Sequence, residues 1–280
     1  MGSISKNVVG GLVQEKAGVH KDRIFLYFKD GAITNQQLEE RSNRFANGFR
    51  DLGITKNDKI AIMMKNHPDF LYTWFGSAKL GAVEVPINNA YKGDLLKHII
   101  NNSESKILVI DVDMMDRLIL IKDELPKLER IICHGEIDEE VSNSLAVPIS
   151  NLEQFFEYTS DPPEVEVKPK DPAGFIYTSG TTGVSKGGVC PHKFFLHQAK
   201  LVSELRDLKS EDILYTFLPM FHFNAQIFTV LTALQNDAQV VLSDRFSASA
   251  FWDDIRKYNA TQFNYLGAVM TILSKQAPKE

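Results

Sequence analysis

Residues 175–188 read FIYTSGTTGVSKGG, an apolar strand-like segment followed by glycines, hydroxyl side chains and one lysine. Phosphate oxygens need several hydrogen-bond donors at short range, and glycines let backbone N–H groups approach closely. Hydroxyl groups add donors without bulk, and the ammonium group of Lys186 suits a polyphosphate. The segment is therefore typical of a phosphate-binding loop that follows a strand.

Two other interpretations compete with this one. Glycine, serine and threonine also make flexible linkers, but a linker rarely follows directly from an apolar strand or places a lysine at a set distance. A Walker-type loop requires Gly-Lys-Ser/Thr, whereas Lys186 stands between Ser185 and Gly187. The sequence contains no GxGxxG pattern, which argues against a dinucleotide fold of the usual kind. The interpretation that remains is a nucleotide-binding loop of another kind.

The run YTSGTTGVSKG closely resembles the signature of the adenylate-forming superfamily, which contains acyl-CoA synthetases, peptide-synthetase adenylation domains and luciferases. The resemblance extends over nearly the whole chain. Ile33–Gly53 and Asn66–Pro86 look like the family's early helix and its next strand–helix–strand passage, and Leu218–Asn224 (LPMFHFN) looks like its second core motif. One departure is Ser185, where the family usually has proline. We expect this serine to cost some loop order without removing a phosphate ligand.

The resemblance implies that the loop holds the β- and γ-phosphates of ATP while a substrate carboxylate attacks the α-phosphorus. Coenzyme A would then accept the acyl group from the acyl-adenylate. Positioned hydrogen-bond donors and Mg²⁺ would supply most of the catalysis, because the reaction redistributes charge among the phosphoryl oxygens. Thr178 is also the candidate magnesium contact. The implied phosphate ligands are Thr178, Ser179, Gly180, Thr181, Thr182, Gly183 and Lys186.

His222 lies between Phe221 and Phe223 in the second motif. A histidine between phenylalanines is more often a core residue, but the matching motif favours a place beside the acid and the adenylate. We assign His222 a positioning role, because a carboxylate is already ionised near neutral pH, and we assign His192 to structure. The candidates for the acyl pocket, whose alternative is a packed helix face, are Phe221, Phe223, Asn224, Gln226, Leu266 and Gly267.

The sequence does not decide which carboxylic acid is the substrate. Pro219–Gln226 and Ser247–Thr261 look most similar to crotonobetaine/carnitine–CoA ligases. A quaternary ammonium acid could use aromatic faces by cation–π attraction. The same aromatic side chains would equally suit a fatty acyl chain.

Short Val/Ile/Leu runs alternate with amphipathic helical segments, which predicts an α/β fold of layered parallel sheets, as in the N-terminal domain of the family. Thr34 and Gln37 form a capping-box pattern before a helix that Gly53 ends, and 24–34 reads as a hairpin. Thr159–Pro172 is rich in proline and charge. We therefore expect an α/β unit over 1–160, a connector over 161–172 and a second, incomplete unit over 173–280.

Composition excludes several classes of function. The formal net charge is −5, and no Lys/Arg run is long enough to indicate nucleic-acid binding. No apolar stretch reaches the roughly 18 residues that span a bilayer. Cys133 and Cys190 have no zinc-like spacing and fit a reducing cytosol. We expect a cytoplasmic protein that binds a small carboxylic acid.

The family continues past the last residue of this sequence. Its later magnesium-assisting glutamate, its ribose-binding aspartate and the mobile domain with the adenylation lysine have no counterpart here. We therefore expect incomplete ATP binding, little turnover and an exposed apolar end that could form a homo-oligomer. The leading hypothesis is the N-terminal part of an acid–CoA ligase. The alternatives are an adenylate-former with another acyl acceptor and a non-catalytic nucleotide-binding or assembly module.

Overall fold

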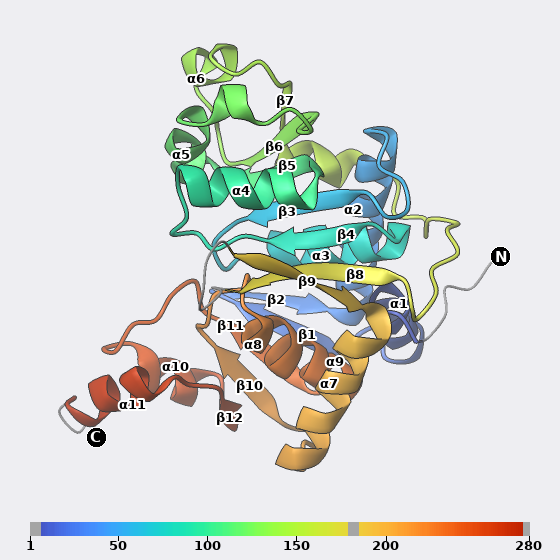
Figure 1. Ribbon diagram of the computed structural model, residues 1–280. Coiled ribbons are helices and arrows are strands. Elements are labelled where there is room, and N and C mark those ends of the chain that lie inside the picture. Colours follow the sequence, from blue (N-terminus) through green and yellow to red (C-terminus); the bar gives the residue numbers. More distant parts are fainter. Residues whose placement is uncertain (1–6, 179–184, 277–280) are drawn as a thin grey trace.

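The computed structural model describes residues 7–178 and 185–276, which build two sheets of mainly parallel strands (Figure 1). The first sheet occupies the upper part of Figure 1 and has the order β7-β6-β5-β3-β4-β8-β9, with only β9 antiparallel to its neighbour. Its strands are β3 (Lys59–Met63), β4 (Val83–Pro86), β5 (Ser105–Asp111), β6 (Arg130–His134), β7 (Ile149–Asn151), β8 (Pro172–Thr178) and β9 (Lys186–Pro191).

The second sheet has the order β12-β10-β11-β1-β2, and only β2 is antiparallel to its neighbour. The hairpin predicted near the start is confirmed as the β1–β2 pair. The strands are β1 (Ile24–Phe28), β2 (Gly31–Thr34), β10 (Ile213–Thr216), β11 (Gln239–Leu242) and β12 (Gln262–Phe263). These two mixed sheets confirm the predicted α/β class with parallel strands.

Each sheet takes strands from both sides of the predicted connector. β1 and β2 pair with β11, while β8 and β9 extend the sheet that contains β4. The predicted division of the chain at 161–172 therefore does not coincide with the division between the sheets. Composition marks where a chain runs irregularly, but it carries no information about which strands pair.

Three N-terminal helices pack together: α1 (Val9–Val19), α2 (Asn35–Asp51) and α3 (Pro68–Leu80). The capping box at Thr34 and Gln37 is confirmed, and Gly53 follows α2 with a φ of 84°. Every residue of α3 is buried. Gly76 of α3 meets α2 closely, because a Cβ there would lie 3.0 Å from the backbone nitrogen of Ala46.

Among the other helices, the consecutive segments Gln226–Leu231 and Thr232–Gln235 are largely buried in the core. No strand was predicted at β7 or β9. The last helix spans Gly267–Ser274, and 277–280 lie outside the described residues. The helices are α4 (Asp94–Ser103), α5 (Met115–Ile119), α6 (Glu139–Asn143), α7 (His192–Arg206), α8 (Phe223–Ala225), a π-helical segment (Gln226–Leu231), α9 (Thr232–Gln235), α10 (Phe251–Lys257) and α11 (Gly267–Ser274).

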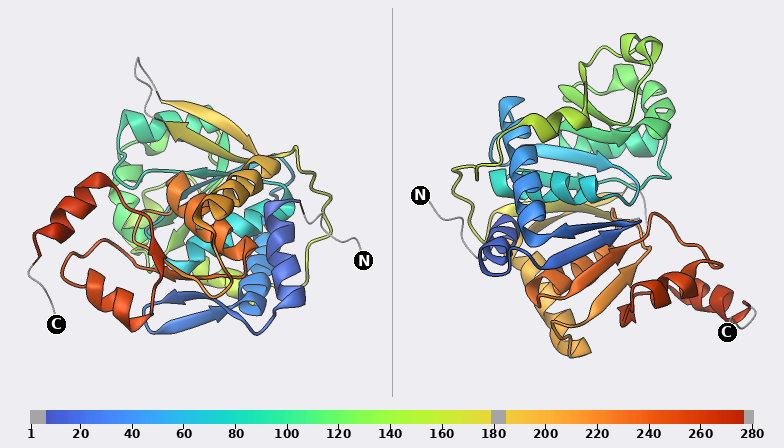
Figure 2. Two further views of the ribbon diagram at one scale, coloured as in Figure 1. Left: turned by 90° about the horizontal axis from the view of Figure 1, so that it is seen from below. Right: turned by 180° about the vertical axis from the view of Figure 1, so that it is seen from behind.

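α10 and α11 lie at an outer corner of the molecule, away from the first sheet (Figure 2). Four large apolar side chains at and before α11 are exposed: Tyr265, Leu266, Met270 and Ile272. Over the described ranges, none of the helices combines the length and apolar content of a membrane span.

Candidate active site

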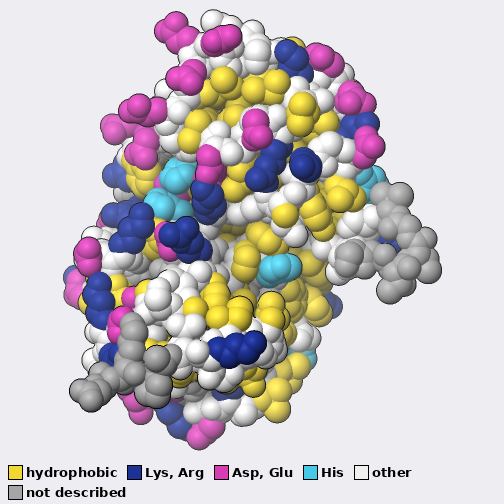
Figure 3. All heavy atoms as spheres, turned by 90° about the vertical axis from the view of Figure 1, so that its left-hand side faces the viewer, with side chains coloured by type: hydrophobic (Ala, Val, Ile, Leu, Met, Phe, Trp, Pro, Cys, Tyr) yellow, Lys and Arg dark blue, Asp and Glu magenta, His cyan; other side chains and the backbone are white. Residues whose placement is uncertain are grey.

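A cavity of about 360 Å³ opens where strands of the two sheets end. Thr178 is the last residue of β8, Asn88 and Tyr91 follow β4, and 221–223 follow β10. Loops at the carboxyl ends of parallel strands are the usual ligand-binding edge of such sheets. The walls include Asn88, Tyr91, Thr178, Phe221, His222 and Phe223. Hydrophobic side chains gather in the middle of the face in Figure 3, with a histidine among them.

The two ends of the predicted phosphate loop are held together at this cavity. Thr178 and Lys186 are register partners in the β8–β9 pair. The Ser185 hydroxyl donates to the Thr178 carbonyl oxygen over 2.7 Å, and the Ser185 carbonyl accepts from His98 Nε2 over 2.9 Å. Ser185 was expected only to cost order, but its side chain ties the loop ends together, which proline could not do. The predicted ligands Ser179, Gly180, Thr181, Thr182 and Gly183 lie outside the described residues.

His222 is the residue directly before the short helix α8 and is exposed at the cavity. Its ring lies 4.4 Å from the Phe221 ring, measured between centroids. Removing part of the imidazole from water lowers the pKa of His222 below 6.5. The ring is therefore mostly neutral near pH 7, where it can offer one hydrogen-bond donor and one acceptor. This chemistry suits positioning of a substrate.

Asn66 fixes the backbone of the segment that carries His222. Its Oδ1 accepts from the Met220 N–H over 2.8 Å, and its Nδ2 donates to the carbonyl oxygens of Leu218 (3.0 Å) and Ser243 (2.9 Å). One buried amide thus joins the ends of β10 and β11. The sequence offered a signal for this role, since Asn66 is a polar residue shortly after a buried strand, but its partners are more than 150 positions away.

Residues 13–280 match the family described as AMP-binding enzyme. This chain belongs to that family. It is 30% identical over 275 residues to long-chain fatty acid transport protein 6 of Mus musculus, covering 92% of this chain and 41% of the relative. It is 31% identical over 282 residues to crotonobetaine/carnitine–CoA ligase of Salmonella enteritidis PT4, covering 91% of this chain and 51% of the relative.

A solved structure of the N-terminal domain of FACL13 from Mycobacterium tuberculosis has the same architecture as this chain. The TM-score is 0.84 at 27% identity, over 96% of this chain and 65% of that domain. The chain spans about half or less of the length of the two curated relatives above. The fold expected from the resemblance, that of the N-terminal domains of adenylate-forming ligases, is therefore confirmed.

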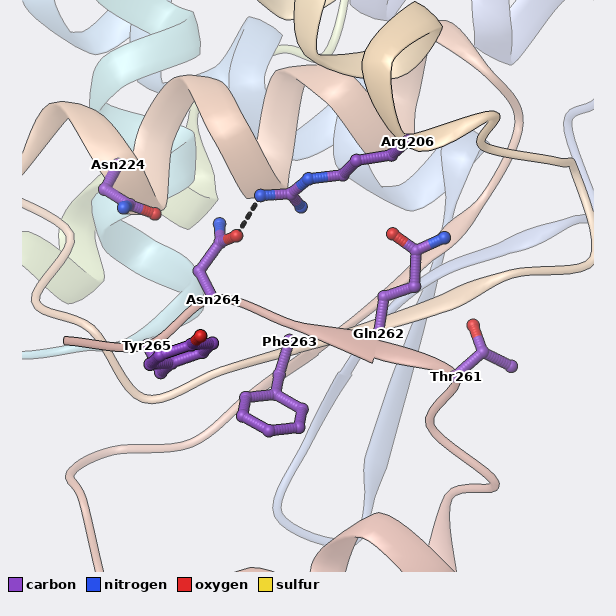
Figure 4. A pocket seen from close by; sticks show the side chains of 7 residues that line it. All are labelled: Arg206, Asn224, Thr261, Gln262, Phe263, Asn264 and Tyr265. Atoms are coloured by element: carbon purple, nitrogen blue, oxygen red, sulfur yellow. Dashed lines mark hydrogen bonds between the residues drawn. The ribbon is translucent and has the colours of Figure 1, made fainter. Parts of the chain in front are cut away.

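The remaining predicted pocket residues lie elsewhere. Asn224 lines a second cavity of about 500 Å³, where Arg206 of α7 hydrogen-bonds to Asn264 (Figure 4). Gln226 is fully buried and donates from Nε2 to Glu84 Oε2 over 3.1 Å. Leu266 and Gly267 are exposed at the start of α11 and line neither cavity.

Two buried groups around the site are structural. Burial raises the pKa of Glu84 well above 4.5, and the hydrogen bond from Gln226 acts in the opposite direction. His192 is fully buried, and its Nδ1 accepts from the N–H of Val9 at the start of α1 over 3.3 Å. Burial lowers the pKa of His192 to about 4. This placement agrees with the structural role expected for His192.

Proposed function

We propose that this chain forms the ATP- and acid-binding part of an enzyme that activates a carboxylic acid as an acyl-adenylate and passes the acyl group to coenzyme A. The observation that carries the proposal is a shared cavity. Thr178 of the strand that leads into the phosphate loop and His222 of the second motif line the same hollow. A triphosphate and a carboxylate must meet at the α-phosphorus, and this arrangement supports such a meeting.

The phosphate end of the site would be formed by the loop. Thr178 and Lys186 are both exposed and lie opposite each other in the β8–β9 pair. In the proposal, Thr178 to Gly183 donate hydrogen bonds to the β- and γ-phosphates, and Lys186 adds a positive charge. Mg²⁺ prefers oxygen ligands, so the Thr178 hydroxyl fits as its contact. When bound, Mg²⁺ would neutralise charge on the phosphates.

The acid end would be formed by the aromatic side. Phe221 and Phe223 supply apolar surface, and the neutral His222 orients the carboxylate through a hydrogen bond. The relatives named above include a crotonobetaine/carnitine–CoA ligase and a long-chain fatty acid transport protein. We propose that the acid carries either a quaternary ammonium group or an apolar chain, both of which aromatic walls accept.

Calorimetry with a non-hydrolysable acyl-sulfamoyl adenosine, an analogue of the acyl-adenylate, tests the proposal directly. We expect saturable one-to-one binding of this analogue. In a separate titration with MgATP, which carries the β- and γ-phosphates, Thr178→Ala should weaken binding at least tenfold. The same calorimetric titration with analogues that carry a long-chain acyl group or a quaternary ammonium acyl group then tests the acid class. Binding of ATP without binding of any acyl-adenylate analogue would support the non-catalytic module and overturn acid activation. If the protein binds neither ATP nor the acyl-adenylate analogue, the proposed site is wrong.

The exposed apolar side chains of α11 support a second proposal, self-association through this helix. Sedimentation at increasing protein concentration should show a dimer that Met270→Lys dissociates. A monomer at all concentrations would contradict it.

The described cysteines Cys133 and Cys190 are both free thiols, which supports the cytosol as the proposed location.

A further inference from the structure

A cluster of potential metal ligands lies at the carboxyl ends of strands of the first sheet. None of its residues lines the cavity that contains Thr178 and His222. The cluster consists of His67, Asp69 and His134. His67 caps α3 and Asp69 belongs to its first turn, directly after β3, while His134 is the last residue of β6. One ligand atom from each residue can be chosen so that all three lie within 4.8 Å of one another.

One oxygen of the Asp69 carboxylate lies close to a nitrogen of each imidazole ring. Its Oδ2 lies 3.4 Å from His67 Nδ1 and 3.5 Å from His134 Nε2. The ring centroids of His67 and His134 are 4.7 Å apart. Asp69 is buried, whereas both histidines keep partial contact with solvent. An ion could therefore reach the cluster from outside and meet an anionic ligand. Binding through His67 Nδ1 would replace the hydrogen bond that this nitrogen accepts from the Asp69 N–H over 3.2 Å. The face in Figure 3 also carries neighbouring histidines among charged side chains.

A second carboxylate orients one of the rings. His134 Nδ1 lies 2.7 Å from Asp111 Oδ1, and the two residues are register partners on β6 and β5. Because this nitrogen donates its hydrogen to Asp111, the lone pair of Nε2 is left toward Asp69. Asp111 is itself fixed, since its Oδ2 accepts from the Lys65 N–H over 2.7 Å. A carboxylate behind a histidine is the usual support of a metal-binding imidazole.

We propose that His67, Asp69 and His134 bind a divalent transition-metal ion, best matched by Zn²⁺, and that Asp111 positions His134 for it. Two imidazoles and one carboxylate are a ligand set that Zn²⁺ accepts in a tetrahedral site, with water as the fourth ligand. Mg²⁺ and Ca²⁺ prefer sites made of oxygen ligands, so this ion differs from the proposed nucleotide-bound Mg²⁺. It would tie the first turn of α3 to β6 beside Asn66, which holds the His222 segment.

The same contacts could instead be a metal-free cluster in which a protonated His134 lies between two carboxylates. Calorimetric titration of the chelator-treated, tag-free protein with Zn²⁺ separates the two. We expect one equivalent to bind, excess Mg²⁺ not to compete, and Co²⁺ to give the absorption spectrum of a tetrahedral site. His67→Gln, Asp69→Asn and His134→Gln should each weaken Zn²⁺ binding more than tenfold. Asp111→Asn should weaken it by about 10–100-fold.

Two matched variants control for unspecific effects. His197→Gln removes an exposed histidine on α7, and Asp113→Asn removes a nearby carboxylate that pairs with Lys65 outside the cluster. Both should bind Zn²⁺ as the wild type does. Circular dichroism and melting without metal show whether each variant is folded. Lack of saturable binding by the wild type, or wild-type affinity in folded His67→Gln and His134→Gln, would overturn the proposal.

Discussion

Ser185 donates its hydroxyl hydrogen to the backbone carbonyl of Thr178 over 2.7 Å. This bond joins the last residue of β8 to the residue that precedes β9, and so it closes the base of the predicted phosphate loop. The hydroxyl is buried with its residue, which is only 8% exposed. A loop whose ends are fixed loses less conformational freedom when a ligand binds.

Ser185→Ala should weaken ATP binding by about 1 kcal/mol, roughly fivefold, because one hydrogen bond of ordinary strength is lost at the base of the loop. Calorimetry with MgATP measures the change. Ser210→Ala, at an exposed position far along the chain, serves as the matched control. Equal affinity of Ser185→Ala and the wild type would show that the contact does not shape the loop.

Lys186→Ala should weaken ATP binding by about 1–3 kcal/mol, the range for a charge-assisted hydrogen bond. The loss should shrink as salt concentration rises, because the ammonium group is exposed and screened. Lys200→Ala removes an exposed lysine of α7 and should leave the affinity unchanged. If both variants bind alike, the positive charge at 186 does not contact the phosphates.

How far the sequence predicts this site depends on the distance over which its residues act. The strand that leads to Thr178, the capping box of α2 and the motif around His222 were recognisable, because each is set by neighbours in the sequence. β9 was missed, since Gly187 and Gly188 have poor strand propensity and only pairing with β8 makes them extended. The exclusion of Gln226 from the cavity was equally hidden, because it depends on Glu84 in a distant strand.

Asn66→Ala should destabilise the fold by about 1–3 kcal/mol, because it leaves buried backbone groups of Leu218, Met220 and Ser243 without their partner. Urea unfolding measures the free energy. Asn143→Ala, at the exposed end of α6, should change it little. The adenylate analogue should also bind Asn66→Ala more weakly under conditions where the variant stays folded. Unchanged stability would mean that water replaces the amide.

The pH dependence of the free energy of unfolding should reveal the titration of the His192 ring. Its pKa is about 4 in the folded protein against 6.5 for the exposed ring, so in this window the unfolded chain binds the proton and the folded protein does not. Stability is therefore lost as pH falls from about 6.5 to about 4, by about 3 kcal/mol from this group.

His192→Asn keeps an acceptor for Val9 and removes the titration, so its free energy of unfolding should fall less steeply over this window than that of the wild type. His197→Asn changes an exposed ring on the same helix and should keep the wild-type slope. Identical slopes in all three proteins would show that His192 does not titrate as its burial requires.

Gly76→Ala should destabilise the protein by about 1–3 kcal/mol, the usual cost of overpacking. An added Cβ would lie 2.9 Å from Phe45 Cβ and 3.1 Å from the Ser42 carbonyl oxygen, so α2 and α3 would have to move apart. Gly18→Ala, where nothing lies within 4 Å, should be neutral or stabilising by up to about 1 kcal/mol. Thermal melting of the two variants makes the comparison, and a Gly76→Ala variant as stable as Gly18→Ala would refute the close approach.

The pairing of β1 with β11 determines when the second sheet can form. Leu26 lies beside Val240 in this sheet, so β1 cannot pair with β11 until roughly two hundred further residues have been synthesised. Until then the hairpin of β1 and β2 presents an open, apolar strand edge to its surroundings. Cells that make this protein should therefore depend on chaperones during its synthesis more than proteins whose strands pair with their sequence neighbours.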